Sequence, residues 1–149
     1  MRKLLSSILL VLPFFGFAQV QDPVSWTFSS KKISDGKYEV HLTATIQTRW
    51  HTYSQTTPEG GPVATSIKFN KNPLVTMEGA AKEVGKMEQH HEELFGIDVK
   101  QFSAKVDFVQ SISIKGNAKT AVTGSIEYMV CNDKECLPPK EARFSISIK

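Results

Sequence analysis

Two cysteines are the residues of this 149-residue sequence whose type and spacing could support chemistry. Cys131 and Cys136 are its only cysteines, and four residues lie between them. At that spacing the two sulfurs can join in a disulfide. Such a bond can either tie the chain together or exchange electrons with the thiols of another protein. The function of the chain therefore depends on which of these the pair does.

The cysteine pair lies between two segments that alternate as strands do. Apolar residues alternate from Val122 to Val130, and again from Ala142 to Ile148. Alternation with a period of two is typical of strands that bury one face. We therefore predict an antiparallel hairpin whose connection is flanked by the two cysteines.

The same alternation predicts further strands over residues 24–28, 38–46, 66–69 and 102–114, with weaker candidates at 74–77 and 81–87. No segment shows a sustained helical period. Short strands separated by turn signals predict an all-β fold, and we expect an immunoglobulin-like β-sandwich. Its core should include the aromatic residues Trp26, Phe28, Tyr38, Phe69, Phe108, Tyr128 and Phe144.

The first residues have the pattern of a secretory leader. Two basic residues precede an apolar run over residues 4–17, and the run ends at small residues. We predict a signal peptide over residues 1–18, cut before Gln19, and one domain over residues 19–149. The run is too short and too interrupted for a membrane span, so the mature chain is expected to have none and to be periplasmic.

The charge of the chain argues against one class of partner. The formal charge is +3, and removing the two basic leader residues leaves 16 basic and 15 acidic residues. A nearly neutral chain gives no electrostatic basis for binding nucleic acid or an anionic membrane.

Export also favours pairing of the cysteines, because compartments outside the cytoplasm are oxidising.

Local residues leave both roles of the disulfide open. Closing so short a loop stabilises a fold by about 2 kcal/mol, which a domain with an adequate core does not require. The four residues between the cysteines are polar, which predicts a bond near solvent. Pro138 and Pro139 should interrupt strand pairing just beyond Cys136 and leave its sulfur reachable. A structural bond and an exchange-active bond remain alternatives at this point.

The residues around the pair resemble those of a known family. The segment 128–139 reads Tyr-Met-Val-Cys-Asn-Asp-Lys-Glu-Cys-Leu-Pro-Pro. It is similar to the active-site segment of the N-terminal periplasmic domain of the thiol:disulfide interchange protein DsbD. Residues 50–54 (Trp-His-Thr-Tyr-Ser) and 92–96 (Glu-Glu-Leu-Phe-Gly) match further pieces in the same order. The resemblance spans the mature chain and implies an immunoglobulin-like fold, in agreement with the strand pattern.

The resemblance also implies a role. Domains of this family take electrons from a thioredoxin-like domain and pass them to periplasmic partners, including disulfide isomerases and cytochrome c maturation proteins. On this chain, Cys136 would form the mixed disulfide with a partner and Cys131 would resolve it. No metal and no organic cofactor are implied. The expected partners are a thioredoxin-like protein or a membrane electron-transfer protein, and periplasmic proteins that contain disulfides.

A short cap loop that shields the disulfide is a further implication of the resemblance. By position, this loop consists of Glu92, Glu93, Leu94, Phe95 and Gly96. Tyr53 would support it, and Leu94 stands where the family has an aromatic residue. The family's full protein continues into a membrane domain and a thioredoxin-like domain. This chain is therefore expected to work as a free-standing module that meets its donor by diffusion.

Other candidate residues give weaker indications. His90 and His91 precede two glutamates, but adjacent histidines on an extended segment point in opposite directions, and no further ligand has a recognisable spacing. His51, beside Trp50, could be an acid–base group or simply packed. No serine has the context of a hydrolase triad. The competing interpretation of the chain is a non-catalytic β-sandwich that binds or scaffolds, with a structural disulfide.

Overall fold

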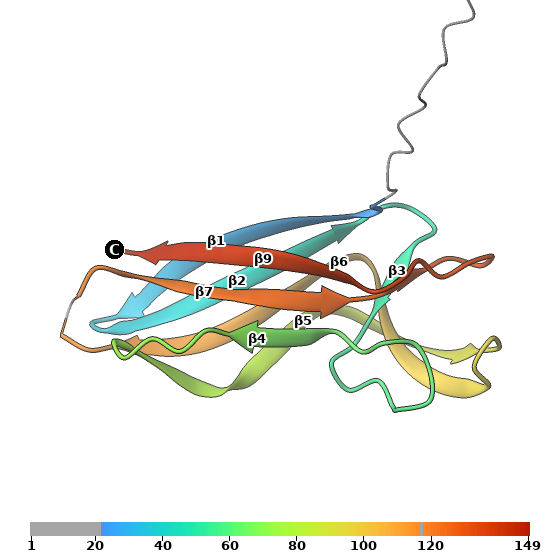
Figure 1. The fold of residues 1–149 in the computed structure, drawn as a ribbon, viewed down its shortest axis with the longest axis horizontal. Coiled ribbons are helices and arrows are strands. Elements are labelled where there is room, and N and C mark those ends of the chain that lie inside the picture. The colour runs from blue at the N-terminus through green and yellow to red at the C-terminus, as the bar shows by residue number, and fades with distance from the viewer. Residues whose placement is uncertain (1–21, 117) are drawn as a thin grey trace, which may run out of the picture.

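The computed structural model describes residues 22–116 and 118–149, so the predicted signal peptide over residues 1–18 lies outside the described residues. The described residues contain nine strands (Figure 1): β1 (Val24–Ser34), β2 (Lys37–Ile46), β3 (His51–Tyr53), β4 (Ser66–Phe69), β5 (Val75–Glu92), β6 (Ile97–Ile114), β7 (Thr120–Tyr128), β8 (Val130–Cys131) and β9 (Lys140–Ile148). Within these ranges no helix is long and apolar enough to cross a membrane.

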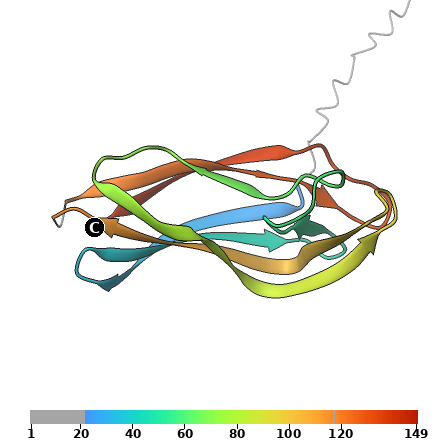
Figure 2. The ribbon, with the colours of Figure 1, turned by 90° about the horizontal axis from the view of Figure 1, so that it is seen from below.

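The strands form two sheets that pack face to face (Figures 1 and 2). The larger sheet has the order β1-β2-β6-β3-β8, and β5 pairs along the other side of β6. The smaller sheet has the order β4-β7-β9. Pairing is antiparallel in both sheets. The chain is thus an all-β sandwich of the immunoglobulin-like class, as the strand pattern predicts.

The apolar faces of the two sheets meet in one main core. Alternation along β2 and β7 turns every second side chain inward, and burying a large apolar side chain stabilises the fold by about 1.5–3 kcal/mol. The predicted aromatic residues are all in or against this core. Phe108, Tyr128 and Phe144 are buried, and the other four lie partly buried at its edge: Trp26, Phe28, Tyr38 and Phe69.

The predicted hairpin around the cysteines is confirmed, but its first strand is divided. β7 pairs with β9 from Thr120 to Tyr128 in the smaller sheet. The next two residues, Val130 and Cys131, pair instead with β3 of the larger sheet. The chain therefore crosses between the sheets at Met129, whose carbonyl oxygen accepts a hydrogen bond of 3.0 Å from Thr52 Oγ1. Alternation continues across this crossing, so the sequence pattern does not reveal it.

The two weak strand candidates at 74–77 and 81–87 are parts of one strand, β5. Its register against β6 shifts twice, between Glu78 and Lys82 and between Gly85 and Met87. Such irregularities place extra residues in one strand and break the alternation along it. A long strand with two register shifts therefore has the sequence pattern of two short ones.

β6 connects the main core to the cysteine pair. Its residues 105–113 pair with β2, and its residues 101–103 pair with β3. Ala104 lies at the joint with a φ of 66°, in the left-handed region that residues other than glycine rarely adopt. The single strand β6 thus pairs with β2 in the body of the sandwich and with β3 near the cysteines. The strand begins at Ile97, earlier than the predicted residue 102.

Candidate disulfide exchange site

Cys131 and Cys136 form a disulfide with an S–S distance of 2.04 Å and a Cα–Cα distance of 4.0 Å. The loop between them is closed by its own hydrogen bonds. The backbone N–H of Asn132 donates to the carbonyl of Glu135 at 2.9 Å. The side-chain oxygen of Asn132 accepts from the N–H groups of Lys134 and Glu135 at 2.8 and 2.9 Å. An asparagine turn of this kind fixes a short loop without help from the core.

The two cysteines differ sharply in exposure. Cys131 is 1% exposed, whereas Cys136 is half-buried and lies outside the named strands. The prediction of a bond near solvent is therefore right for Cys136 and wrong for Cys131. Polarity of the intervening loop says nothing about Cys131, because that residue belongs to β8 and is paired with β3.

A small apolar cluster surrounds Cys131 on the face of the large sheet opposite the main core. Successive residues of a strand point to opposite faces. Val130 belongs to the main core, so Cys131 points away from it. His51 is the pairing partner of Cys131 and shares its face, as does Tyr53. The cluster consists of Cys131, Tyr53 and Val99, with Ile97, Met129 and Cys136 packed against it.

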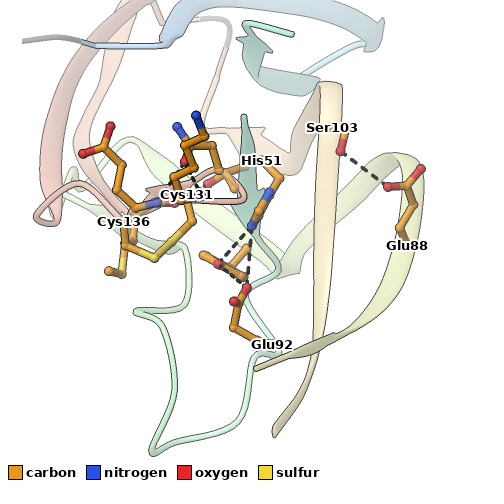
Figure 3. Close-up of polar contacts among 12 residues, drawn as sticks. His51, Glu88, Glu92, Ser103, Cys131 and Cys136 are labelled. Carbon is orange, nitrogen blue, oxygen red and sulfur yellow. Dashed lines mark hydrogen bonds and ion pairs between the residues drawn. A yellow bond between two sulfur atoms is a disulfide. The ribbon is translucent and has the colours of Figure 1, made fainter. Parts of the chain in front are cut away.

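Three polar side chains meet beside this cluster (Figure 3). Tyr53 Oη lies 3.1 Å from Glu92 Oε2, and His51 Nε2 lies 3.1 Å from Tyr53 Oη. His51 Nε2 is also 3.8 Å from Glu92 Oε2. All three residues are buried. Burial, together with the neighbouring Glu92 carboxylate, raises the pKa of Tyr53, so its hydroxyl keeps its proton over the physiological range.

The five residues predicted as a cap loop lie at the tip of the β5–β6 hairpin. Glu92 ends β5, and its carbonyl accepts hydrogen bonds from the N–H groups of Phe95 and Gly96 at 3.1 and 2.8 Å. Leu94 is 67% exposed and Phe95 is 36% exposed. Glu93 and Gly96 are exposed as well. Glu92 is thus the buried member of the five, and its contact with Tyr53 joins the predicted support to the predicted loop.

Sequence reasoning did not identify two apolar neighbours of the disulfide, Ile97 and Met129. Ile97 pairs with Glu92 across the hairpin. The tip therefore contributes a polar side chain from one strand and an apolar side chain from the other. The available signal was the position of Ile97, the first apolar residue after the turn at Gly96. Met129 carried no such signal, because it lies at the crossing between the sheets.

A groove of about 330 Å³ opens beside the loop between the cysteines, and His51 and Asp133 are among its lining residues. A second hollow of about 210 Å³ shares Arg49, Trp50 and Asp133 with it. The intercysteine loop therefore borders a concave surface on the side of the β2–β3 connection.

The paired histidines of β5 do not converge on a ligand site. His91 Nδ1 lies 2.8 Å from Asp98 Oδ1 across the hairpin, on the exposed side. Over residues 22–116 and 118–149, no group of three or more His, Cys, Asp or Glu side chains could hold a metal ion.

We expect the free energy of unfolding to fall as the pH drops below about 6.5. Burial lowers the pKa of His51 from its ordinary value of 6.5, and His90 acts in the same sense, although Glu92 and Asp133 oppose them. The unfolded chain therefore binds a proton at higher pH than the folded chain, so acid favours unfolding. Urea denaturation between pH 7.5 and 5 measures this slope, which should be shallower in His51→Gln. An unchanged slope in that variant would contradict the assignment.

Solved structures from Proteus mirabilis and Neisseria meningitidis have a similar fold. The N-terminal periplasmic domain of ScsB from Proteus mirabilis matches with a TM-score of 0.50 and 17% identity over 84% of this chain; the chain spans 44% of that structure's length. The reduced DsbD N-terminal domain of Neisseria meningitidis matches with a TM-score of 0.51 and 16% identity, over 82% of this chain and 84% of that one.

A third structure is the complex between the DsbD N-terminal and PilB N-terminal domains of Neisseria meningitidis. It matches with a TM-score of 0.51 and 14% identity, over 85% of this chain and 87% of that one. At these identities the likeness shows the fold. A search of curated protein sequences gave no significant match. The sequence profile described as thiol:disulfide interchange protein DsbD, N-terminal, matches residues 18–148. Because this match covers nearly the whole sequence, the chain belongs to the family of DsbD N-terminal domains.

Proposed function

We propose that this chain is a periplasmic thiol–disulfide interchange module. It passes electrons between a thioredoxin-like donor and periplasmic acceptor proteins through the Cys131–Cys136 pair. The observation that carries the proposal is the asymmetry of the disulfide: Cys131 is buried, whereas Cys136 is half-buried at the end of the sheet. An exchange reaction needs one sulfur that an incoming thiolate can reach, and Cys136 is the less buried of the two.

The family supports the same conclusion. Its description is thiol:disulfide interchange, and the match covers residues 18–148. One similar structure is a complex of a DsbD N-terminal domain with another protein's N-terminal domain, so a domain of this fold can bind a protein partner. The hollow lined by residues 132–134 is a concave surface on the loop between the cysteines, on which such a partner could rest.

The exchange proceeds in two balanced half-reactions. A donor thiolate attacks Cys136 Sγ, which forms a mixed disulfide and releases Cys131 as a thiolate that takes up a proton. The donor's second thiolate then attacks the donor sulfur that is bonded to Cys136. This step frees Cys136 as a thiolate and leaves the donor with a disulfide. The chain has gained two electrons. Cys136 passes them on by attacking an acceptor disulfide, and Cys131 resolves the second mixed disulfide.

Glu92, Glu93, Leu94, Phe95 and Gly96 complete the proposed site as its cap, with Tyr53 as support. The proposal is supported by the position of Ile97, which follows these residues and packs against the disulfide cluster. The exposed Leu94 and Phe95 lie between the two side chains that attach the hairpin tip, Glu92 and Ile97.

A trapping experiment tests the function. Reduced Cys131→Ala keeps the Cys136 thiol but has no sulfur to resolve a mixed disulfide. The partner is a thioredoxin-like domain that lacks its second cysteine and carries thionitrobenzoate on the remaining one. We expect Cys136 to displace the thionitrobenzoate and to hold the partner in a covalent complex that survives denaturing, non-reducing electrophoresis and is released by dithiothreitol. The matched Cys136→Ala variant should give no complex, because the remaining sulfur is buried. If neither variant forms a complex, the exchange function is wrong.

A second candidate function is a binding or scaffold module with a structural disulfide. The burial of Cys131 among Tyr53 and Val99 is the observation that favours it. The reduction potential separates the two functions: structural disulfides lie below about −300 mV, whereas exchange-active pairs lie between about −120 and −270 mV.

A further inference from the structure

His51 has contacts that the chemistry of the cysteines does not use. Its Nε2 lies 3.1 Å from Tyr53 Oη, which in turn lies 3.1 Å from Glu92 Oε2. A carboxylate can only accept, so the single hydroxyl proton of Tyr53 is donated to Glu92. Tyr53 Oη must then accept from His51, and Nε2 of the imidazole carries the hydrogen. The three groups form a hydrogen-bond chain with one direction, from His51 through Tyr53 to Glu92.

The two ends of this hydrogen-bond chain lie on different parts of the fold. His51 and Tyr53 belong to β3, which is held between β6 and β8 and pairs directly with Cys131. Glu92 is the last residue of β5, and its carbonyl accepts the N–H groups that close the hairpin tip. The hydrogen bonds therefore tie the tip of the hairpin to the strand beside the disulfide.

The attachment of the tip involves few of its own side chains. Of residues 92–97, Glu92 is buried and Ile97 is half-buried, while the four residues between them are exposed. Ile97 supplies an apolar contact with the cluster around Cys131. The directional, polar part of the attachment therefore depends on what holds the Glu92 carboxylate, namely Tyr53 and His51.

We propose that His51 is a positioning residue that fixes the hairpin tip beside the disulfide. By donating to Tyr53 it orients the hydroxyl toward Glu92, and a fixed tip limits the access of reagents to Cys136. The inference deepens the proposed function and rests on it, because a cover matters only for a disulfide that exchanges. The effect of His51 on access to the disulfide can, however, be tested with a small reagent and no protein partner.

The test uses the phosphine TCEP, which reduces the disulfide to two thiols and is itself oxidised to the phosphine oxide with oxygen from water. His51→Phe fills the space but leaves Tyr53 without its donor, so we expect reduction about fivefold faster than in the wild type. His51→Gln places an amide N–H close to the position of Nε2 and should stay within about twofold of the wild type. His91→Phe, the same change on the exposed side of the hairpin, is the matched control and should also stay within about twofold.

Hydrogen exchange at the tip gives a direct readout. The N–H groups of Phe95 and Gly96 close the tip on the carbonyl of Glu92. They should exchange about fivefold faster in His51→Phe than in the wild type, and at the wild-type rate in His51→Gln. If His51→Phe does not fold, Tyr53→Phe replaces it. That variant removes one hydroxyl from the same chain of hydrogen bonds and should show the same two increases.

The proposal is overturned if the donor-lacking variant matches the wild type in both measurements, or if His51→Gln is as fast as His51→Phe. In the second case the shape of the side chain, and not its N–H, would be responsible. Failure of the proposed function is distinguishable from both, since it appears as absence of trapping with Cys131→Ala while the His51 variants still differ in reduction rate.

Discussion

Iodoacetamide should alkylate Cys136 of the reduced protein about a hundredfold faster than Cys131. Cys131 is 1% exposed and lies in an apolar cluster with Tyr53 and Val99, so the reagent reaches it only after a local opening. An opening that costs about 3 kcal/mol slows a reaction by about a hundredfold. The Cys131 thiolate must itself attack the reagent, so its alkylation waits for that opening. Mass spectrometry of peptides sampled over time measures both rates in one sample.

A concentration of urea that unfolds the chain provides the control for this experiment. Once the chain is unfolded, the two thiols have the same access to solvent, so the difference between Cys136 and Cys131 should shrink to less than about threefold. Equal rates in the folded protein would show that reduction opens the cluster around Cys131. The division of roles between the two sulfurs would then have no structural basis.

Gly124→Val should lower the free energy of unfolding by at least about 3 kcal/mol. Gly124 occupies an inward position of β7, between the neighbours β4 and β9. A Cβ at this position would overlap the carbonyl oxygen of Lys68 and come within 2.6 Å of Phe144 Cζ. A carbonyl of a paired strand cannot move aside without breaking the ladder. We therefore expect the midpoint of thermal unfolding to fall by about 10 °C or more.

Ser125→Val is the matched control for this change. Ser125 is the next residue of β7 and its side chain points to the other face of the sheet, half-buried. A β-branched residue suits such a position, so the stability should change by less than about 0.5 kcal/mol. A similar loss in both variants would show that β7 does not tolerate valine for reasons other than the contact with Lys68.

Most of the fold could be predicted from alternation, because the long strands β2, β7 and β9 each bury one face. The strand boundaries that the sequence did not predict have a physical cause. The pattern reports which face of a strand is buried but does not report which strand lies beside it. Val130 keeps the phase of β7 although its partner is Thr52 of the other sheet. The two register shifts in β5 had the opposite effect and made one strand look like two.

The candidate site was predictable where a residue's chemistry is carried by its type, as for the two cysteines. It was not predictable where the role comes from a partner that is distant in the sequence. The sequence favoured a packed or exposed His51 over an acid–base group, and only the fold showed that it lies 3.1 Å from Tyr53 Oη and 3.8 Å from Glu92. The exposure of Leu94 could not be predicted either, because it depends on how the hairpin tip lies on the sheet.

The separation of the two apolar clusters bears on how such domains diverge. Val130 and Cys131 are neighbours in one short strand, yet they belong to clusters on opposite faces of the large sheet. Replacements around the sulfurs therefore leave the packing between the sheets undisturbed. Substitutions near the disulfide can therefore change its reactivity during evolution while the β-sandwich is retained. The similar structures share the sandwich with this chain at only 14 to 17% identity.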